Sequence, residues 1–247
     1  MIGILGGMGT NAGLDFCNKL AILNKGKVDQ KYPLFLLFNK SNIPGRTESI
    51  SLAATSSYNN FGQPKNLNKY NKVLKSLIAG CLLLQKNNCR FIAIPCNTAH
   101  YWYDDLQKKI KIPIINMPRE VYLYTKKNCK KKSKIGILAT EGTLKTKVYN
   151  NFFDKNFLLI RPKKNLQMGS VNKAIKYVKM GKIKEAEKAI QPAISFLLKM
   201  KCKKIILGCT ELPIAVFSLK FLKKNKSSKI FIDPNLILAS VSMKKNS

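Results

Sequence analysis

The sequence predicts an α/β fold of two pseudo-symmetric domains, each with a mainly parallel sheet flanked by helices, and an active-site cleft between them. The main observation is an internal repeat, in which three short apolar segments occur twice in the same order. The first two pairs are 133 and 113 residues apart, and the third is about 117 residues apart. Helical periodicity between these segments, in a chain of 247 residues, completes the pattern of alternating strands and helices.

The repeated segments have the composition of buried parallel strands. Each is short, apolar and rich in β-branched residues, and each ends in a glycine or a polar turn. The pairs are residues 2–10 with 135–143, residues 89–98 with 202–211 and, more weakly, residues 112–116 with 230–233.

Helices are predicted between these strands. Residues 68–86 carry apolar side chains at helical spacing, and residues 183–200 do the same, with Pro192 starting or kinking a segment. Residues 98–110 are expected to form the helix that follows the strand ending near Cys96. Residues 234–243 are expected to form a last helix that packs back on the first half of the chain.

The repeat divides the chain into two domains. The first spans residues 1–117 and also takes the C-terminal helix, residues 234–247, while the second spans residues 118–233. The chain then crosses twice between the domains, which predicts a hinged cleft.

Composition excludes several classes of protein. Apolar residues make up 45% of the chain, which is enough for a sizeable core. The chain has no run of ~18 apolar residues, so the sequence predicts no membrane span. The N-terminus lacks the basic and apolar regions of a signal peptide. We therefore expect a cytoplasmic protein.

The charge balance is strongly basic, with 45 lysines and arginines against 12 acidic residues and a net charge of +33. Such a charge is typical of proteins that bind nucleic acid or anionic membranes. Only four of these cations are arginines, and the lysines are spread along the chain, which favours biased codon usage over a phosphate-reading surface. Neither nucleic acid nor a membrane is an expected partner, and a surface selected for polyanions stays as the alternative.

The cysteines do not form a recognisable framework. There are seven of them in a chain without a secretory signal, so no disulfide pattern is predicted. No C-x2-C pair occurs and His100 is the single histidine, so neither a metal site nor a serine–histidine hydrolase is expected. We assign His100 a structural role.

Two of the cysteines occupy equivalent positions in the repeat. Cys96 and Cys209 fall at the carboxyl ends of predicted strands, where ligands bind in parallel α/β sheets. Cys89 and Cys202 fall at the opposite strand ends. If the halves face each other, one thiolate can remove a proton from a carbon while the other thiol returns one to the opposite face, which inverts a stereocentre. A helix N-terminus after each cysteine would favour the thiolate. The alternative is that both are inert buried residues.

Five motifs that occur in order along the chain resemble those of the aspartate/glutamate racemase family, and within it the aspartate racemase branch. They are Gly6-Gly7-Met8-Gly9, Ile43-Pro44-Gly45-Arg46-Thr47, Pro95-Cys96-Asn97-Thr98-Ala99-His100, Ala139-Thr140-Glu141-Gly142-Thr143 and Gly208-Cys209-Thr210-Glu211. Glutamate racemases usually carry serine where this chain has His100 and histidine where it has Glu211.

The resemblance implies an isomerase that needs no cofactor and no metal, acts on a small acidic amino acid and forms a homodimer. It implies that Cys96 and Cys209 are the acid/base pair, with Cys96 deprotonating the D-enantiomer and Cys209 the L-enantiomer.

The resemblance also implies two anion sites for a dicarboxylate substrate. Arg46 is expected to clamp one carboxylate through its planar guanidinium, and Lys179, in a Val-Lys-x-Gly segment, supplies a second cation. An ordinary solvated lysine is the alternative for Lys179, and helix capping is the alternative for Thr140 and Thr143. The other expected substrate-binding residues are Met8, Gly9, Thr47, Asn97, Thr98 and Thr210.

The sequence therefore favours an aspartate racemase. A broad-specificity aspartate/glutamate racemase, or a related isomerase acting on hydantoins or maleate, is the nearer alternative. A polyanion-binding protein with a vestigial cleft is the alternative from a different class, and it predicts binding that depends steeply on salt.

Overall fold

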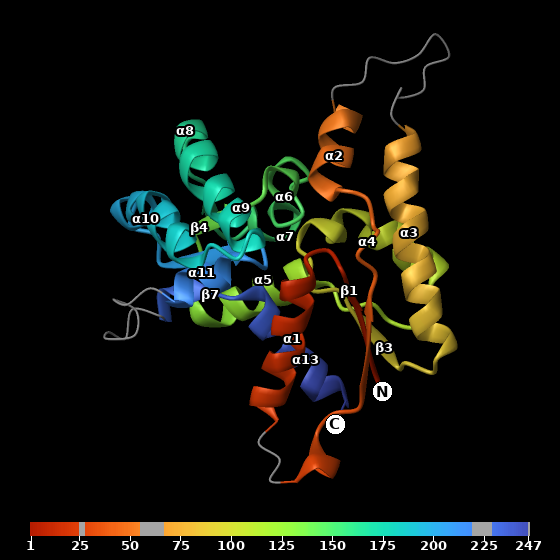
Figure 1. The fold of residues 1–247 in the computed structure, drawn as a ribbon. Coiled ribbons are helices and arrows are strands. Elements are labelled where there is room, and N and C mark those ends of the chain that lie inside the picture. Colours follow the sequence, from red (N-terminus) through yellow and green to blue (C-terminus); the bar gives the residue numbers. More distant parts are fainter. Residues whose placement is uncertain (25–27, 55–66, 219–228, 247) are drawn as a thin grey trace.

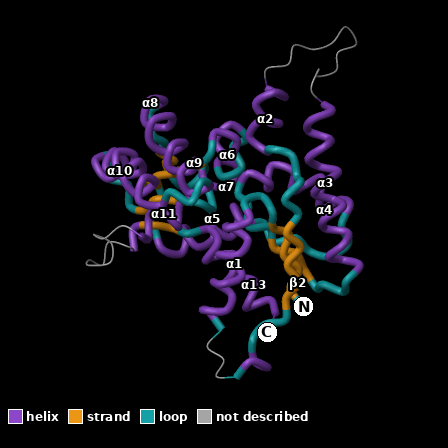
Figure 2. The backbone as a smooth tube through the Cα atoms, in the orientation of Figure 1, coloured by secondary structure: helices purple, strands orange, loops and turns teal. Residues whose placement is uncertain are grey.

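The computed structural model describes residues 1–24, 28–54, 67–218 and 229–246, and it contains two separate parallel sheets flanked by helices (Figures 1 and 2). One sheet is built by the first half of the chain and the other by the second half. The predicted α/β fold class is confirmed.

The first sheet has the strand order β2-β1-β3. Helices α1 and α3 both contact β1 and β2, and in Figure 1 they lie on opposite sides of these strands. The strands are β1 (Ile2–Gly6), β2 (Phe35–Asn39) and β3 (Phe91–Ala93). The helices of this half are α1 (Thr10–Leu23), η1 (Asp29–Lys31), α2 (Arg46–Ala54), α3 (Leu67–Lys86), η2 (Thr98–Trp102) and α4 (Tyr103–Lys109).

The second sheet has the strand order β5-β4-β6-β7. Its strands are β4 (Lys134–Ala139), β5 (Leu158–Ile160), β6 (Lys204–Gly208) and β7 (Phe231–Ile232). The helices described after α4 along the chain are α5 (Met117–Asn128), α6 (Glu141–Lys145), α7 (Asn150–Phe153), α8 (Lys164–Leu166), η3 (Gln167–Asn172), α9 (Lys173–Lys179), α10 (Ile183–Lys199), α11 (Leu212–Ser218) and α13 (Pro234–Asn246).

The two sheets share one topology, as the internal repeat predicts. β1 pairs with β2 on one side and β3 on the other, and β4 pairs with β5 and β6 in the same way. The third predicted pair is only half correct. Residues 230–233 contain β7, whereas residues 112–116 form a single bridge between Ile92 and Ile114. Pro113 explains the difference, because it has no N–H to extend a ladder.

The repeat also appears where the long helices end. Asn88 after α3 and Lys201 after α10 both adopt the left-handed conformation, each with φ of 58°. Each is followed by a buried cysteine, Cys89 or Cys202, that leads into the next strand. This is a common way to stop a helix and redirect the chain. Pro192 neither starts nor ends a helix but lies inside α10.

One hydrophobic core joins the two halves. It combines Ile4 of β1 and Phe16 of α1 with Ile137 of β4, Phe153 of α7 and Leu238 of α13, all of them buried. Because burial of each large apolar side chain contributes about 1.5–3 kcal/mol, this shared core fixes the position of one half against the other.

The C-terminal helix straddles both halves. α13 packs on α1, as predicted, and also on α5, and α13 lies beside α1 in the lower part of Figure 1. At its start, Lys19 of α1 forms an ion pair with the buried Asp233 at 2.8 Å and a second, shorter pair with Asp15. The carboxylate of Asp233 also accepts from the backbone N–H of Asn235 at 2.9 Å, which anchors the crossover back to the first half.

Candidate active site

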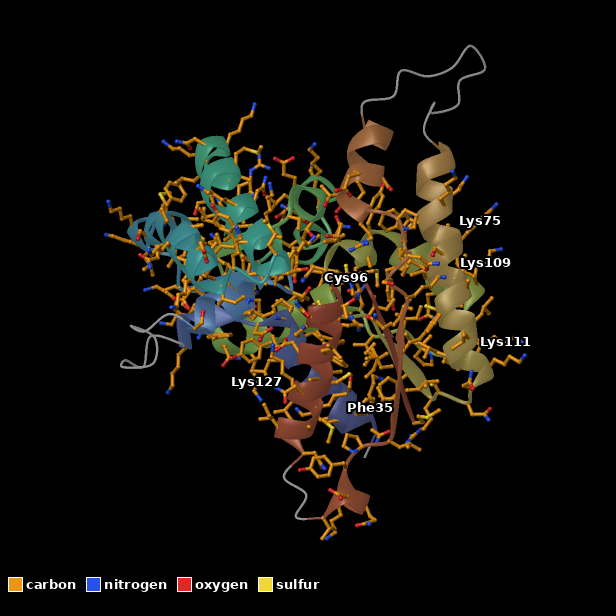
Figure 3. All side chains as sticks on the ribbon, viewed as in Figure 1. Phe35, Lys75, Cys96, Lys109, Lys111 and Lys127 are labelled. Atoms are coloured by element: carbon orange, nitrogen blue, oxygen red, sulfur yellow. The ribbon has the colours of Figure 1, made fainter. Side chains whose placement is uncertain are left out.

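The carboxyl ends of four strands meet at one pocket of about 160 Å³. Met8 follows β1, Cys96 follows β3, Thr140 follows β4 and Cys209 follows β6. Ligands of parallel α/β sheets bind at this end of the strands. Figure 3 places Cys96 near the centre of the molecule, between its two halves. The pocket is also lined by Gly45, Arg46, Thr47, Glu48, Asn97, Thr98, Lys179, Thr210 and Glu211.

Cys96 is 6% exposed and lies in a tight turn after β3. Its carbonyl accepts a hydrogen bond from Nδ1 of His100 at 2.9 Å. Burial lowers the pKa of His100, so the ring is neutral and its Nε2 accepts from the backbone N–H of Met117 at 3.1 Å. His100 therefore ties the Cys96 turn to the crossover between the halves and does not line this pocket. The helix predicted over residues 98–110 is a 3₁₀ turn, η2, that continues as α4.

Cys209 is also 6% exposed, but its surroundings differ. Its thiol donates a hydrogen bond to Oε2 of Glu211 at 2.9 Å. Burial, and then the negative charge of Glu211, raise the pKa of Cys209 well above its usual range, while Lys179 acts in the opposite direction. The backbone N–H of Glu211, at the start of the following segment, lowers this pKa as expected, but desolvation and the nearby carboxylate outweigh it. At neutral pH Cys209 is a protonated thiol.

A threonine cluster joins the two halves beside Cys96. The hydroxyl of Thr98 forms hydrogen bonds with the hydroxyls of Thr143 at 2.8 Å and Thr140 at 3.1 Å. Thr140 also caps α6 by accepting from the backbone N–H of Thr143 at 3.2 Å, and it lines the pocket as well. Gly142 allows this close approach, since a Cβ there would lie 2.7 Å from the hydroxyl of Thr47.

Asn97 lies between the two cysteine-bearing halves and is 2% exposed. Its Oδ1 is 2.5 Å from the hydroxyl of Tyr149, which belongs to the second half of the chain. Its Nδ2 has no hydrogen-bond partner among the described residues. A buried donor without a partner at the wall of a pocket is a group that a bound ligand would satisfy.

Arg46 is held against the pocket wall by backbone carbonyls. Its Nη2 donates to the carbonyl of Met8 at 2.7 Å, and its Nη1 lies 3.3 Å and 3.4 Å from the carbonyls of Pro44 and Ile43. A guanidinium has five N–H donors, so donors remain for a ligand. Arg46 is the first residue of α2, and Glu48, in the first turn of that helix, also lines the pocket.

Lys179 reaches the pocket from the far end of a helix. It is exposed and is the last residue of α9, which continues directly from the π-helical turn η3. Gln167 anchors that turn to the end of β4 by donating to the carbonyl of Ala139 at 2.9 Å. π-Helical turns within helices are frequent near functional sites.

All predicted site residues line this pocket except Gly9 and Thr143. Thr143 lies behind Thr98. Gly9, with φ of 143°, passes close to Glu211, and a Cβ there would be 2.5 Å from Oε1 of that carboxylate.

The prediction missed three lining residues. They are Gly45, Glu48 and Glu211. The signal for Glu211 was present in the Gly-Cys-Thr-Glu motif, as an acid two residues after a cysteine.

A second pocket, of about 270 Å³, lies on the other side of His100. Neither a cysteine nor a lysine or arginine is among its lining residues. It therefore lacks both the pair of thiols and the cations that the first pocket offers to an anion.

The described part of the chain contains neither a cluster of metal ligands nor a membrane-spanning helix. No three histidine, cysteine, aspartate or glutamate side chains there gather as a metal site requires. None of the helices in those residues is both long and apolar enough to cross a membrane.

Comparison with known proteins gives consistent results. The chain is 26% identical over 219 residues to the broad specificity amino-acid racemase RacX of Bacillus subtilis (strain 168), which covers 86% of each chain. It is 30% identical over 180 residues to the glutamate racemase of Prochlorococcus marinus (strain NATL2A), which covers 69% of this chain and 60% of that protein.

Solved structures extend the likeness to the whole fold. The aspartate racemase of Picrophilus torridus matches with a TM-score of 0.79 and 26% identity, over 99% of this chain and 93% of that chain. The glutamate racemase of Francisella tularensis in complex with D-glutamate matches in fold, with a TM-score of 0.66 and 18% identity, over 99% and 80% of the two chains. The family model described as Asp/Glu/hydantoin racemase matches residues 5–240. The chain therefore belongs to the Asp/Glu/hydantoin racemase family of isomerases.

Proposed function

We propose that the protein is an aspartate racemase that interconverts L- and D-aspartate by proton transfer between Cys96 and Cys209, without a cofactor. The observation that carries the proposal is the placement of two equally buried thiols, each 6% exposed, at the ends of the equivalent strands β3 and β6 and on one pocket. A single thiol would exchange the α-proton on one face only, whereas two can invert the carbon.

The reaction neither consumes nor releases a proton overall. A thiolate on one face takes the α-proton, and the electron pair moves into the carboxylate to give an enediolate. The thiol on the other face then donates its proton to the α-carbon and becomes the thiolate. In the resting protein Cys209 carries its proton, so the resting protein is the form in which Cys209 donates a proton to the α-carbon. In the reverse direction the thiolate left on Cys209 takes the α-proton, and the thiol on the opposite face donates its own.

The charges of the pocket suit an acidic amino acid. Arg46 and Lys179 provide one cation for each carboxylate of the substrate, and Glu48 is a partner for its ammonium group. The enediolate needs neutral donors as well, which Asn97 and Thr98 supply from the turn that carries Cys96.

The size of the pocket favours the smaller diacid. A volume of about 160 Å³ is comparable to the ~150 Å³ cavity that holds a benzene ring, so it leaves little room beyond aspartate. A broad-specificity aspartate/glutamate racemase is the second candidate, because the relative from Bacillus subtilis carries a broad-specificity name.

The proposal also includes the two-domain division, with residues 1–117 and 234–247 in one domain and residues 118–233 in the other. The separate sheets on either side of the pocket support it. By the same resemblance we expect a homodimer, which analytical ultracentrifugation of the purified protein would test.

A polyanion-binding role is less well supported. Lys75, Lys109 and Lys111 extend outward at the far edge of the first half, away from Cys96 (Figure 3). Solvated lysines of this kind keep a protein soluble without forming a site.

The test is proton NMR of L-aspartate and L-glutamate incubated with the reduced protein in D₂O. We expect loss of the α-proton signal of aspartate, faster than that of glutamate, with the D-enantiomer appearing on chiral chromatography. An α-proton that persists in both substrates would overturn the proposal. Faster exchange of glutamate, or equal exchange of both, would favour the broad-specificity candidate.

A further inference from the structure

Tyr149 is a deeply buried polar residue that contacts a residue of the pocket wall. It is 1% exposed and lies at the start of α7, packed edge-on against Phe153. Its hydroxyl reaches across to the first half and lies 2.5 Å from Oδ1 of Asn97, 52 residues away in the chain. Tyr149 itself does not line the pocket.

The hydrogen of this bond belongs to the phenol. Burial, and the negative charge of Asp233, raise the pKa of Tyr149, so the hydroxyl stays protonated. A protonated phenol that faces the amide oxygen of Asn97 donates to it. In the opposite amide orientation the phenol oxygen would accept from Nδ2, and Asn97 would offer no acceptor to the phenol O–H.

The orientation of the Asn97 amide has a consequence for the pocket. With Oδ1 bound to Tyr149, Nδ2 is directed away from the phenol, and it has no partner among the described residues. Asn97 is 2% exposed and follows Cys96 directly. Asn97 also lines the pocket, so its unpartnered N–H groups are ones that an anionic substrate bound there would satisfy.

We propose that Tyr149 is a positioning residue, which fixes the amide of Asn97 so that Nδ2 donates to a carboxylate or enediolate oxygen of the substrate. The inference rests on the proposed racemase function, because it needs an anionic substrate beside Asn97. Tyr149, in the second half of the chain, would thus orient a side chain of the turn that carries Cys96, in the first half.

The kinetic test is a double-mutant cycle of Tyr149→Phe with Asn97→Ala. We expect Tyr149→Phe to lower kcat/KM for aspartate about tenfold, the effect of misplacing one hydrogen bond to a charged group. In the Asn97→Ala background the same change should have no further effect. Additive losses, or a wild-type kcat/KM for Tyr149→Phe, would overturn the proposal.

Tyr122→Phe is the matched control. Tyr122 packs against the same Phe153 and its hydroxyl accepts from Asn156 at 2.7 Å, away from the pocket. We expect Tyr122→Phe and Tyr149→Phe to shift Tm by similar amounts, with kcat/KM lowered only by Tyr149→Phe. Equal losses of kcat/KM in the two variants would assign Tyr149 a purely structural role.

A second readout does not depend on activity. The side-chain amide signals of Asn97 in a ¹⁵N-labelled protein are identified by their absence in Asn97→Ala. Tyr149→Phe should shift these signals and Tyr122→Phe should not. If the amide signals shift while the wild-type protein exchanges no α-proton, the racemase function fails and the positioning of Asn97 stands. If they do not shift, the positioning role fails whatever the activity.

Discussion

Glu211 accepts a hydrogen bond from the thiol of Cys209 at 2.9 Å, two residues along the chain. The residue at the equivalent position after Cys96 is Thr98, whose hydroxyl instead bonds to Thr143 across the boundary between the halves. The repeat thus places both thiols on one pocket, and this one difference gives them different surroundings. Cys209 has an acid beside it that keeps it protonated, whereas the Cys96 turn is tied to the opposite half.

Replacing Glu211 should change the titration of Cys209. Glu211→Gln removes the negative charge that disfavours the thiolate, so we expect the pKa of Cys209 to fall. Thiolate absorbance in the ultraviolet, measured against pH and taken as the difference from the same protein with Cys209→Ser, follows this group. Glu141→Gln, which removes an acid of α6 outside the pocket, is the control. An unmoved titration in Glu211→Gln would mean that burial alone sets this pKa.

Each of the two thiols should be required for racemisation. Cys96→Ala and Cys209→Ala should each lower kcat by about 10²–10⁴-fold or more, the usual contribution of a positioned acid or base. Chiral chromatography of aspartate over time gives the rate. Cys89→Ala and Cys202→Ala are matched controls, since these buried thiols start the same strands at the opposite end. A Cys96 or Cys209 variant that racemised at the control rate would exclude two-base catalysis.

The planar guanidinium of Arg46 should matter more than its charge. Arg46→Lys keeps the charge but loses the bidentate geometry and the hydrogen bond to the carbonyl of Met8, so we expect KM for aspartate to rise about 10–100-fold.

The role of the second cation is tested with two lysines of α9. Lys179→Ala should also raise KM, whereas Lys176→Ala, an exposed lysine of the same helix outside the pocket, should not. Initial rates against aspartate concentration separate KM from kcat. Equal KM values for the Lys179 and Lys176 variants would remove Lys179 from the site.

The buried ion pair between Lys19 and Asp233 should be costly to break. Lys19→Met leaves the carboxylate of Asp233 uncompensated, because its side chain is only 2% exposed, and we expect a loss of about 3–5 kcal/mol in the free energy of unfolding. Lys145→Met is the control. It breaks an exposed pair with Glu141 at 3.9 Å and should cost at most about 1 kcal/mol. Urea unfolding measures both, and similar losses in the two variants would contradict the prediction.

Stability should fall at alkaline pH. Burial raises the pKa of Cys81 to about 12, whereas a thiol in the unfolded chain titrates near ~8.5. Between these values the unfolded state binds fewer protons, so the free energy of unfolding decreases as pH rises and is fully retained below ~8.5. Cys81 contributes a slope of up to about 1.4 kcal/mol per pH unit in this range. Urea unfolding from pH 8 to 10 should show a smaller slope in Cys81→Ala, and an unchanged slope would contradict the assignment.

Much of the fold could be predicted because it is encoded locally. Apolar runs and helical spacing mark strands and helices within a few residues, and the repeat relates β1 to β4 and β3 to β6. The prediction was wrong where one residue outweighed the pattern. Pro113 reduces the segment around Ile114 to a single bridge.

Some features of the candidate site could likewise be predicted from the sequence, and others could not. The sequence by itself determined that Cys96 and Cys209 lie at strand ends on one pocket, because the carboxyl ends of parallel strands share one edge of a sheet. Arg46 and Lys179 lie on helices and were expected only from the family resemblance. Only the tertiary structure decided the contacts of Glu211 with Cys209 and of Tyr149 with Asn97. These contacts depend on burial, on side-chain rotamers and on how one half is placed against the other through their shared core. None of these features leaves a repeating pattern in the sequence from which it could be predicted.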